Sequence, residues 1–198
     1  MRQVIGIDEV GRGCLAGPVV VVAALVTGRV GDAALGPLRD SKKLTRLQRE
    51  AWFDHLTKSP RVRFALARVY PRQIEKRNIS RAANVAAQRA YERLAARERA
   101  GRRARVFLDG GLYIGSRSAQ PAHAKTVIKG DEKIPAVAVA SIIAKVSRDR
   151  FMARLGKKFP AYGFEIHKGY GTAAHRKAIR ENGPTPAHRL TFLAQNVQ

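Results

Sequence analysis

Two adjacent carboxylates, Asp8 and Glu9, follow the apolar run Val4–Ile7 and precede the turn Gly11-Arg12-Gly13. Side-by-side carboxylates repel each other unless a cation lies near them, whereas a glycine turn exposes backbone N–H groups and an arginine adds a guanidinium. The pattern predicts a bound cation next to a bound phosphate. Ordinary surface charges at the end of a strand are the alternative, and these residues alone do not exclude it.

Two further carboxylates also stand where predicted strands end. The run that begins at Ala104 leads to Asp109 before two glycines, and the short strand 125–129 leads to Asp131. A long helix separates strand 62–70 from strand 104–109, which predicts a parallel crossover, and such sheets place their sites beyond the carboxyl ends of the strands. We therefore expect Asp109 to lie near Asp8.

The apolar patterning predicts an α/β chain. Strands are expected at 4–10, 19–26, 62–70, 104–109 and 125–129, the second paired antiparallel with the first. Thr45 is the expected N-cap of a helix to about Lys58, whose inner face is expected to carry Leu47, Ala51 and Phe53, or Phe53 and Leu56. Ser80 is the expected cap of an alanine-rich helix ended by Gly101. Further helices are expected at 135–158 and 172–182. These elements must position the acidic residues.

Composition favours a polyanion as the partner. The chain carries 38 lysines and arginines against 15 acidic residues, a net charge of +23. Each phosphate that a protein neutralises releases condensed counterions, which favours the binding of nucleic acid to so basic a chain. The arginine-rich stretch 89–105 is equally well explained as a solvated helix face. Net charge thus predicts the class of partner and leaves the chemistry open.

Length and patterning predict one domain in a reducing compartment. The 198 residues suffice for a single core. The longest uncharged apolar stretch, residues 14–27, is too short to cross a bilayer, which needs ~20 apolar residues. The first strand leaves no room for a signal peptide, and the single cysteine, Cys14, cannot form an internal disulfide. We expect a cytoplasmic protein that does not span a membrane.

Six motifs of the chain resemble bacterial ribonuclease HII, a type 2 ribonuclease H. In chain order they are Gly6–Gly13, Asp40–Leu44, Leu108–Gly110, Lys129–Asp131, Ala140–Asp149 and His167–Tyr170. The resemblance extends from about Val4 to Phe192 with the motifs in the family's order. It covers most of the chain.

This resemblance implies a ribonuclease H-like fold and a nuclease activity. The fold would be a five-stranded mixed sheet, three strands antiparallel and two parallel, flanked by helices and followed by a helical C-terminal segment. Residues 1–198 would form one catalytic domain, with about 160–198 as a substrate-binding extension. The activity implied is endonucleolytic: hydrolysis of the RNA strand of RNA–DNA hybrids, and cutting 5′ of single ribonucleotides in duplex DNA, as in ribonucleotide excision repair. A monomer is expected.

The resemblance also assigns the ligands of the metal site. By their positions in the motifs, the catalytic and metal-binding residues would be Asp8, Glu9, Asp109 and Asp131. Two Mg²⁺ or Mn²⁺ ions are expected in the substrate complex, because a pair of divalent cations can stabilise both the attacking and the departing oxygen and needs several acidic oxygens. The expected products carry 5′-phosphate and 3′-hydroxyl ends.

Substrate contacts are implied at the remaining motifs. Gly11, Arg12 and Gly13 would read the ribose 2′-OH, although a tight turn alone also explains these glycines. Tyr170 would pack on a nucleotide, with a core tyrosine as the alternative. The residues expected to contact phosphates are Lys42, Lys43, Ser141, Lys145 and Lys168.

Other features of the sequence stay open. His167, His175 and His188 match no zinc-ligand spacing and are expected to form hydrogen bonds or contact phosphate. Asp149 is expected to pair with Arg148 or Arg150. A basic module that binds nucleic acid without cutting it would explain the charge but not the acids at the strand ends. Another ribonuclease H-fold enzyme, such as a junction-resolving nuclease or ribonuclease HIII, is the second alternative.

Overall fold

The protein folds around a five-stranded mixed sheet, which we describe from a computed structural model covering residues 3–98, 104–116, 118 and 120–196. The strand order is β3-β2-β1-β4-β5. β1 pairs antiparallel with β2, β2 pairs antiparallel with β3, and β1 and β5 each pair in parallel with β4. The strands are β1 (Gln3–Val10), β2 (Val19–Thr27), β3 (Val62–Val69), β4 (Arg105–Asp109) and β5 (Ala124–Val127). The predicted fold class and mixed sheet are confirmed.

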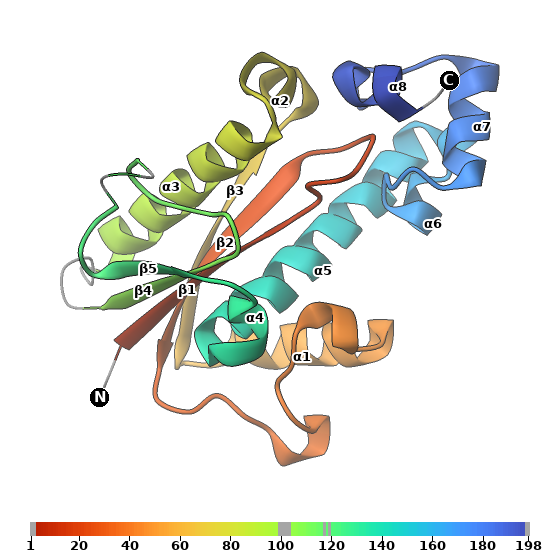
Figure 1. Cartoon of the computed structure of the whole chain (residues 1–198). Coiled ribbons are helices and arrows are strands. Elements are labelled where there is room, and N and C mark those ends of the chain that lie inside the picture. The colour runs from red at the N-terminus through yellow and green to blue at the C-terminus, as the bar shows by residue number, and fades with distance from the viewer. Residues whose placement is uncertain (1–2, 99–103, 117, 119, 197–198) are drawn as a thin grey trace.

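Helices cover both faces of this sheet (Figure 1). The α-helices are α1 (Arg46–Lys58), α2 (Pro71–Arg77), α3 (Ile79–Glu98), α4 (Gly130–Lys133), α5 (Pro135–Lys158), α6 (Phe164–His167), α7 (Ala173–Asn182) and α8 (Leu190–Asn196). Short 3-10 helices are η1 (Ala33–Leu35), η2 (Ser41–Lys43) and η3 (Pro160–Tyr162). Within the described ranges, no helix combines the length and the apolar character needed to cross a membrane.

Alternation along the strands divides the core into two layers. Ile5 and Ile7 pack with the alanine-rich face of α3, while Val22 and Ala24 pack with α5 and with Trp52 of α1. Successive strand residues point to opposite faces of a sheet. Side chains at consecutive positions of β1 therefore reach different helical layers, which matters for the two acids that follow Ile7.

The sheet and α5 approach each other closely at Gly6. A Cβ atom added to Gly6 would lie 2.1 Å from the backbone carbon of Ala136 in the first turn of α5. Pro135 at the start of this helix and the small residues Ala136 and Ala140 leave its backbone free to approach β1. α5 is thereby fixed directly beneath the central strand.

The segment after α5 packs against the loop that joins β1 and β2. Leu15 and Ala16 of this loop form a third apolar cluster with Met152, Phe164 and neighbouring side chains. The Leu15 N–H donates to the carbonyl oxygen of Gly169 at 2.8 Å, and the Arg189 N–H donates to the carbonyl oxygen of Leu15 at 2.8 Å. Residues 11–18 are thus held between two parts of the C-terminal segment.

The helix boundaries confirm some expectations and correct others. Thr45 caps α1 through a capping box with Gln48, as predicted. Leu47 is wrong as an inner residue, since it is 82 % exposed, whereas Leu56 faces the core as predicted and Trp52, which was not predicted there, is also buried. Ser80 does not cap α3: the Asn78 side chain accepts the Arg81 N–H at 3.0 Å. The predicted end of this helix at Gly101 lies outside the described residues.

The contact at Gly6 predicts a large effect of a single methyl group. Gly6→Ala is expected to lower the free energy of unfolding by about 3 kcal/mol or more, because a Cβ would overlap the backbone of α5, which cannot move without leaving the sheet. Urea unfolding of both proteins measures this difference. Gly31→Ala is the matched control, since nothing lies within 4 Å of its Cβ position, and we expect a change under about 1 kcal/mol. Equal stabilities of the two variants would contradict the packing described.

Candidate active site

Three carboxylates meet where the two central parallel strands end. β1 and β4 pair with Ile7 opposite Leu108, so that Asp8 and Asp109 leave adjacent strands side by side. One ligand oxygen each from Asp8, Glu9 and Asp109 lies within 4.8 Å of the others. The expected meeting of Asp8 and Asp109 is therefore confirmed, and it follows from strand register.

The two neighbouring acids of β1 are held from opposite sides. The Asp8 carboxylate accepts a hydrogen bond from the hydroxyl of Ser141 on α5 and one from the Glu9 N–H at 2.8 Å. The Glu9 Oε1 accepts from Arg12 Nη1 at 3.0 Å, and Arg12 Nη2 donates to Ser80 Oγ of α3 at 3.1 Å. Each face of the sheet thus supplies one support for the acidic pair.

Burial and mutual repulsion act on the charge of these acids. Burial, followed by repulsion from Glu9 and Asp109, raises the pKa of Asp8 well above its usual range, against the hydrogen bonds from Ser141 and Glu9. Burial also raises the pKa of Glu9, while its contact with Arg12 acts in the opposite direction. The folded protein therefore disfavours the ionised form of both acids in the absence of a cation.

Asp131 lies beside this group but is turned toward a lysine. It stands in α4, directly after β5, and its Oδ2 is 3.7 Å from Lys42 Nζ. Burial, Asp109 and Asp40 together raise the pKa of Asp131. The Gly130 N–H donates to Asp109 Oδ1 at 2.6 Å, so that the turn before Asp131 also orients the carboxylate of Asp109.

The three clustered acids fit a divalent cation. Glu9 Oε2 is buried and has no hydrogen-bond partner among the described residues, although a buried acceptor is normally satisfied. It belongs to a set of carboxylates whose repulsion a cation would relieve, and carboxylate oxygens are the ligands that Mg²⁺ and Mn²⁺ prefer. Asp8, Glu9 and Asp109 are the residues placed to hold such an ion, with Asp131 next to them.

The two glycines of the predicted ribose reader differ in their surroundings. Gly11 has a φ of 88°, and a Cβ there would lie 2.2 Å from Arg148 Nε. Gly13 is exposed, and nothing lies within 4 Å of its Cβ position. The tight-turn explanation thus accounts for Gly11, whereas the open space at Gly13 allows a ligand to approach the backbone.

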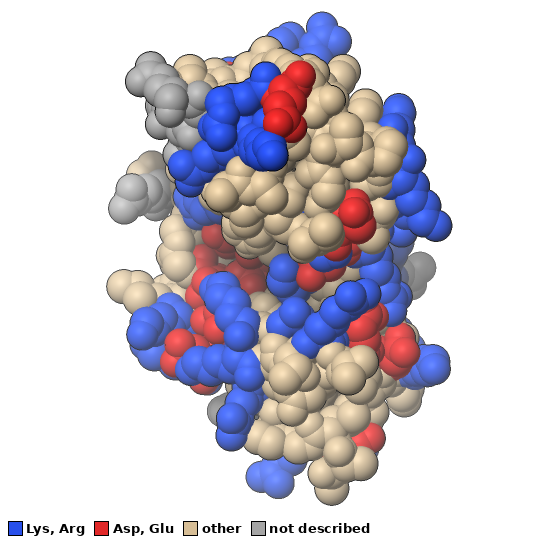
Figure 2. Space-filling model, turned by 90° about the vertical axis from the view of Figure 1, so that its right-hand side faces the viewer, with Lys and Arg blue, Asp and Glu red and all other residues tan. Residues whose placement is uncertain are grey.

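Lysines flank the acids on the side of η2 and α4. Lys42 faces Asp131, and Lys43 pairs with Glu132 at 3.0 Å. Ser41, beside them, shares a buried 2.8 Å hydrogen bond with Ser141 of α5. Ser141, predicted as a phosphate contact, is itself buried and joins η2 to Asp8. In Figure 2 acidic side chains line a hollow in the middle of the face shown, and basic side chains gather around it.

Tyr170 lies in the C-terminal segment, next to Cys14 of the loop that follows β1. It is 42 % exposed, so the alternative of a core tyrosine is wrong. Lys145 Nζ lies 6.0 Å from the centre of its ring, and Lys145 also pairs with Asp149 at 2.8 Å, which corrects the expected partners Arg148 and Arg150. Lys168 donates from Nζ to the Glu165 carbonyl at 2.5 Å, and burial lowers the pKa of its amine.

The three histidines of the C-terminal segment form hydrogen bonds, as one of the two expected alternatives stated. His175 Nδ1 donates to the Tyr170 carbonyl at 2.8 Å, and its Nε2 lies 3.2 Å from His188 Nε2. His167 Nδ1 accepts the Gly169 N–H at 3.1 Å. Burial lowers the pKa of both His175 and His188 to about 4. Neutral imidazoles thus fasten the backbone that carries Tyr170.

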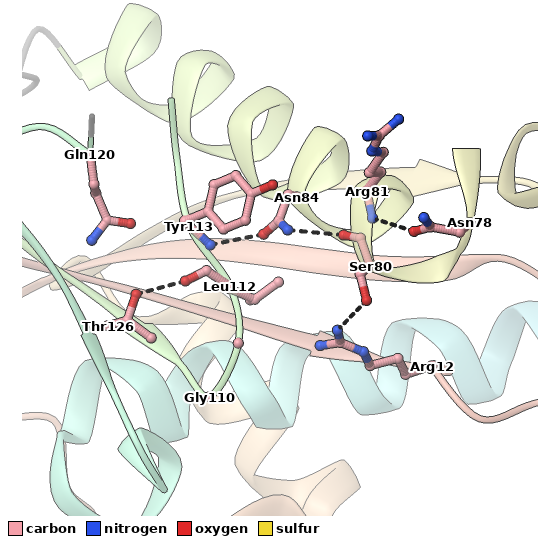
Figure 3. Close-up of a pocket in the computed structure, with 11 residues that line it drawn as sticks. Arg12, Asn78, Ser80, Arg81, Asn84, Gly110, Leu112, Tyr113, Gln120 and Thr126 are labelled. Carbon is pink, nitrogen blue, oxygen red and sulfur yellow. Dashed lines mark hydrogen bonds between the residues drawn. The ribbon is translucent and has the colours of Figure 1, made fainter. Parts of the chain in front are cut away.

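A groove that the sequence analysis missed opens next to Arg12 (Figure 3). Its volume is about 630 Å³. A line of hydrogen bonds crosses it, from Arg12 to Ser80, from Asn84 to the Ser80 carbonyl at 2.9 Å, and from the Tyr113 N–H to Asn84 Oδ1 at 2.8 Å. Asn84, a buried amide within an alanine-rich helix, is the one signal in the sequence that could have indicated it.

Comparison with known sequences identifies a family for this fold and site. The sequence model of the family described as Ribonuclease HII matches residues 5–195. The Ribonuclease HII of Roseiflexus castenholzii is 45% identical over 193 residues, covering 96% of this chain and 82% of that protein. The Ribonuclease HII of Granulibacter bethesdensis is 43% identical over 191 residues, covering 96% and 83%.

Solved structures agree on the fold. A chain of the PCNA:RNase HII complex from Archaeoglobus fulgidus has a TM-score of 0.71 and 28% identity, covering 96% of this chain and 94% of that one. Bst-RNase HIII, solved in complex with Mn²⁺, has a TM-score of 0.76, but at 21% identity and 68% coverage of that chain it shows the fold alone. The family match and the sequence identities, not the superpositions, separate the two classes, and the chain belongs to the ribonuclease HII family, a group of ribonuclease H nucleases.

Proposed function

We propose that this protein is a metal-dependent endonuclease that cuts the RNA strand of RNA–DNA hybrids and cuts 5′ of single ribonucleotides in duplex DNA. The observation that carries the proposal is the group of three carboxylates within 4.8 Å, with an unsatisfied Glu9 oxygen, in a chain of net charge +23 from the ribonuclease HII family. An acidic centre in a basic protein suits a reaction on a phosphodiester, because the surface attracts the polyanion and the acids hold the metal.

Asp8, Glu9, Asp109 and Asp131 are proposed as the residues that hold two Mg²⁺ or Mn²⁺ ions in the substrate complex. Bound there, such ions supply an activated water and stabilise the departing 3′-oxygen. The protein contributes the geometry: Ser141 and the Glu9 N–H orient Asp8, the Gly130 N–H orients Asp109, and Arg12 orients Glu9. The proposed products are 5′-phosphate and 3′-hydroxyl ends.

The turn Gly11-Arg12-Gly13 is proposed to recognise the ribose. Its position directly after Asp8 and Glu9 places it beside the acids, and the open surroundings of Gly13 support close approach of a sugar. The 2′-OH is the group that distinguishes one nucleotide as RNA, and backbone donors can reach it only where no side chain intervenes. A contact at this turn would therefore select the cutting site.

Basic and aromatic side chains around the centre are proposed to hold the rest of the duplex. Lys42 and Lys43 flank the acids from η2, and Lys145, Lys168 and Tyr170 flank the glycine turn from α5 and from the C-terminal segment. Ser141 is also proposed to contact a phosphate; because it is buried against Ser41, that phosphate would have to approach it from η2. Residues 160–198 are proposed as the substrate-binding extension. Two hydrogen bonds join this segment to Leu15 of the loop after β1, one from the Leu15 N–H to the Gly169 carbonyl and one from the Arg189 N–H to the Leu15 carbonyl, and they support that role.

We further propose that the chain acts as a monomer in the cytoplasm and serves ribonucleotide excision repair. The proposed substrate, a ribonucleotide within DNA, supports the repair role. A basic module that binds without cutting stays the second candidate, because the same charge would serve it. A module that only binds needs no acidic cluster. Loss of cutting when the acids are substituted therefore separates the two functions.

A single duplex tests the proposal. A double-stranded DNA with one ribonucleotide is expected to be cut 5′ of that ribonucleotide with Mg²⁺ and to stay intact in EDTA. Asp109→Asn is expected to lower turnover by about 100-fold or more with little change in substrate binding, because a metal-ligand charge is lost without a change in shape. Asp54→Asn on the exposed side of α1 is the control. Turnover of Asp109→Asn within tenfold of the wild type would refute the assignment, as would equal cutting of all-DNA duplex.

The raised pKa of Asp8 gives a second prediction, about stability. A carboxyl whose folded pKa is raised adds stability below the unfolded pKa and loses it as pH rises through the folded pKa. At neutral pH, Asp8→Asn should therefore raise the melting temperature in EDTA. Mg²⁺ or Mn²⁺ should raise the melting temperature of the wild type but much less that of the variant. Calorimetry measures these melting temperatures, with Asp54→Asn as the control. An equal rise on adding metal in the wild type and in Asp8→Asn would contradict a metal site at Asp8.

Tyr170 gives a third prediction. Stacking of an aromatic side chain on a base contributes ~1–3 kcal/mol, so Tyr170→Ala should slow cutting of the single-ribonucleotide duplex by about ten- to a hundredfold. Tyr170→Phe keeps the ring and should lose less. The melting temperature should change little, because the side chain is exposed. Tyr70→Ala removes another exposed tyrosine and is expected to cut normally. Loss of activity in proportion to a large fall in melting temperature would show a structural role instead.

A further inference from the structure

Two arginine side chains are fully buried without a carboxylate partner among the described residues. Arg148 lies on α5 and Arg189 directly precedes α8, and both are 0 % exposed. Within the described part of the chain, every hydrogen bond of either guanidinium ends on a backbone carbonyl oxygen. A charge withdrawn from water without an acid beside it is unfavourable unless its N–H groups are satisfied. The carbonyls that satisfy them belong mostly to one loop.

That loop is residues 11–18, which contains the proposed ribose reader. Arg189 donates from Nη2 to the Gly11 carbonyl at 2.7 Å and from Nη1 to the Arg12 carbonyl at 2.8 Å. It also donates from Nε and Nη2 to the Gly17 carbonyl at 3.1 and 2.8 Å. One guanidinium fork thus spans both ends of the loop, a geometry that a lysine ammonium cannot reproduce.

Arg148 donates to two other carbonyl groups of this loop. It donates to the Ala16 carbonyl at 3.0 Å and to the Pro18 carbonyl at 3.0 Å, and its third bond, at 2.8 Å, goes to Lys168. Its contacts leave the carbonyls of residues 11 and 12 to Arg189. The orientation of the first two peptide groups of the turn therefore depends on Arg189.

The peptide geometry fixes where the opposite groups point. In a trans peptide the C=O and the following N–H point in opposite directions. Because the carbonyls of Gly11 and Arg12 face the buried guanidinium, the N–H groups of Arg12 and Gly13 face away from it. Neither N–H has an acceptor among the described residues. The Arg12 side chain is already engaged with Glu9 and Ser80, so the free donors of this turn are backbone groups.

We infer that Arg189 is a positioning residue for ribose recognition: by holding the carbonyls of Gly11 and Arg12 inward, it aims the N–H groups of Arg12 and Gly13 at the oxygens of the substrate's ribonucleotide. This inference rests on the proposed function, since the acids beside the turn are what bring a ribonucleotide there. Although burial lowers the pKa of Arg189 to about 10, the side chain keeps its charge and all its donors at neutral pH.

Hydrogen exchange of the unmodified protein tests the direction of these donors. Resolved by residue, the N–H groups of Arg12 and Gly13 should exchange rapidly in the free protein. A single-ribonucleotide duplex in EDTA should slow them more than the all-DNA duplex of the same sequence, because only the first offers a 2′-oxygen as acceptor. Slow exchange of both groups in the free protein, or equal slowing by the two duplexes, would overturn the inference.

A variant tests the role of Arg189 itself. The measured quantity is the ratio of the dissociation constants of the all-DNA and the single-ribonucleotide duplexes, in EDTA. Arg189→Lys keeps the charge but not the fork and should reduce this ratio by about fivefold or more, the effect of losing roughly one hydrogen bond. Tyr162→Phe is the matched control: it removes hydroxyl bonds to Asn182 and Gly183 in the same segment without touching the turn, and it should keep the ratio of the wild type.

The outcomes separate this inference from the proposed function. A wild type that binds both duplexes equally would contradict the proposed ribose recognition. A wild type that discriminates, together with an Arg189→Lys variant that discriminates equally well, would overturn the role of Arg189 alone. If Arg189→Lys does not fold, the exchange experiment on the wild type still decides the direction of the donors. Equal loss of the ratio in Tyr162→Phe would show a merely structural effect.

Discussion

Repulsion among Asp8, Glu9 and Asp109 is opposed by the packing of strands and helix at the centre of the sheet. The parallel register of β1 and β4 brings the acids together, and the approach of α5 at Gly6 places Ser141 within reach of Asp8. These contacts belong to the interior of the fold and cannot relax to separate the charges. The unfavourable electrostatic energy therefore remains in the folded protein, where a bound cation would relieve it.

The surroundings of the buried arginines fit the repulsion among these acids. Although basic residues far outnumber acidic ones, the two deepest arginines are satisfied by carbonyl oxygens and not by acids. An acid placed beside Arg148 or Arg189 would lie close to the glycine turn and would repel a phosphate there. Carbonyl dipoles satisfy the guanidinium N–H groups without adding a negative charge. The groups that satisfy these two guanidinium ions thus leave the positive charge near the turn uncancelled.

Much of the site could be predicted from the sequence because each acid is marked by a pattern of neighbouring residues. Asp8 and Glu9 follow an apolar run, Asp109 follows another, and the helix between strands implies parallel pairing, so the meeting of these acids needs only strand order and register. Arg148 and Arg189 could not be predicted in this way. Apart from the Lys168 carbonyl, their partners lie 130 residues or more away, on a loop without periodicity. Ser80 failed as a cap because α3 begins one residue earlier, at Ile79, where Asn78 accepts the Arg81 N–H, while the serine hydroxyl accepts from Arg12 in a tertiary contact.

The bond between Arg189 and the carbonyl of Arg12 joins residues 177 positions apart, and this separation has a consequence in time. At a synthesis rate of about 5–20 residues per second, roughly 10–35 s pass between the appearance of the turn and that of the arginine that orients it. Throughout this interval the acids of β1 are already made, while the loop beside them lacks its support. A nascent chain, or one cut short before Arg189, therefore has these acids without the arginine that orients the turn beside them.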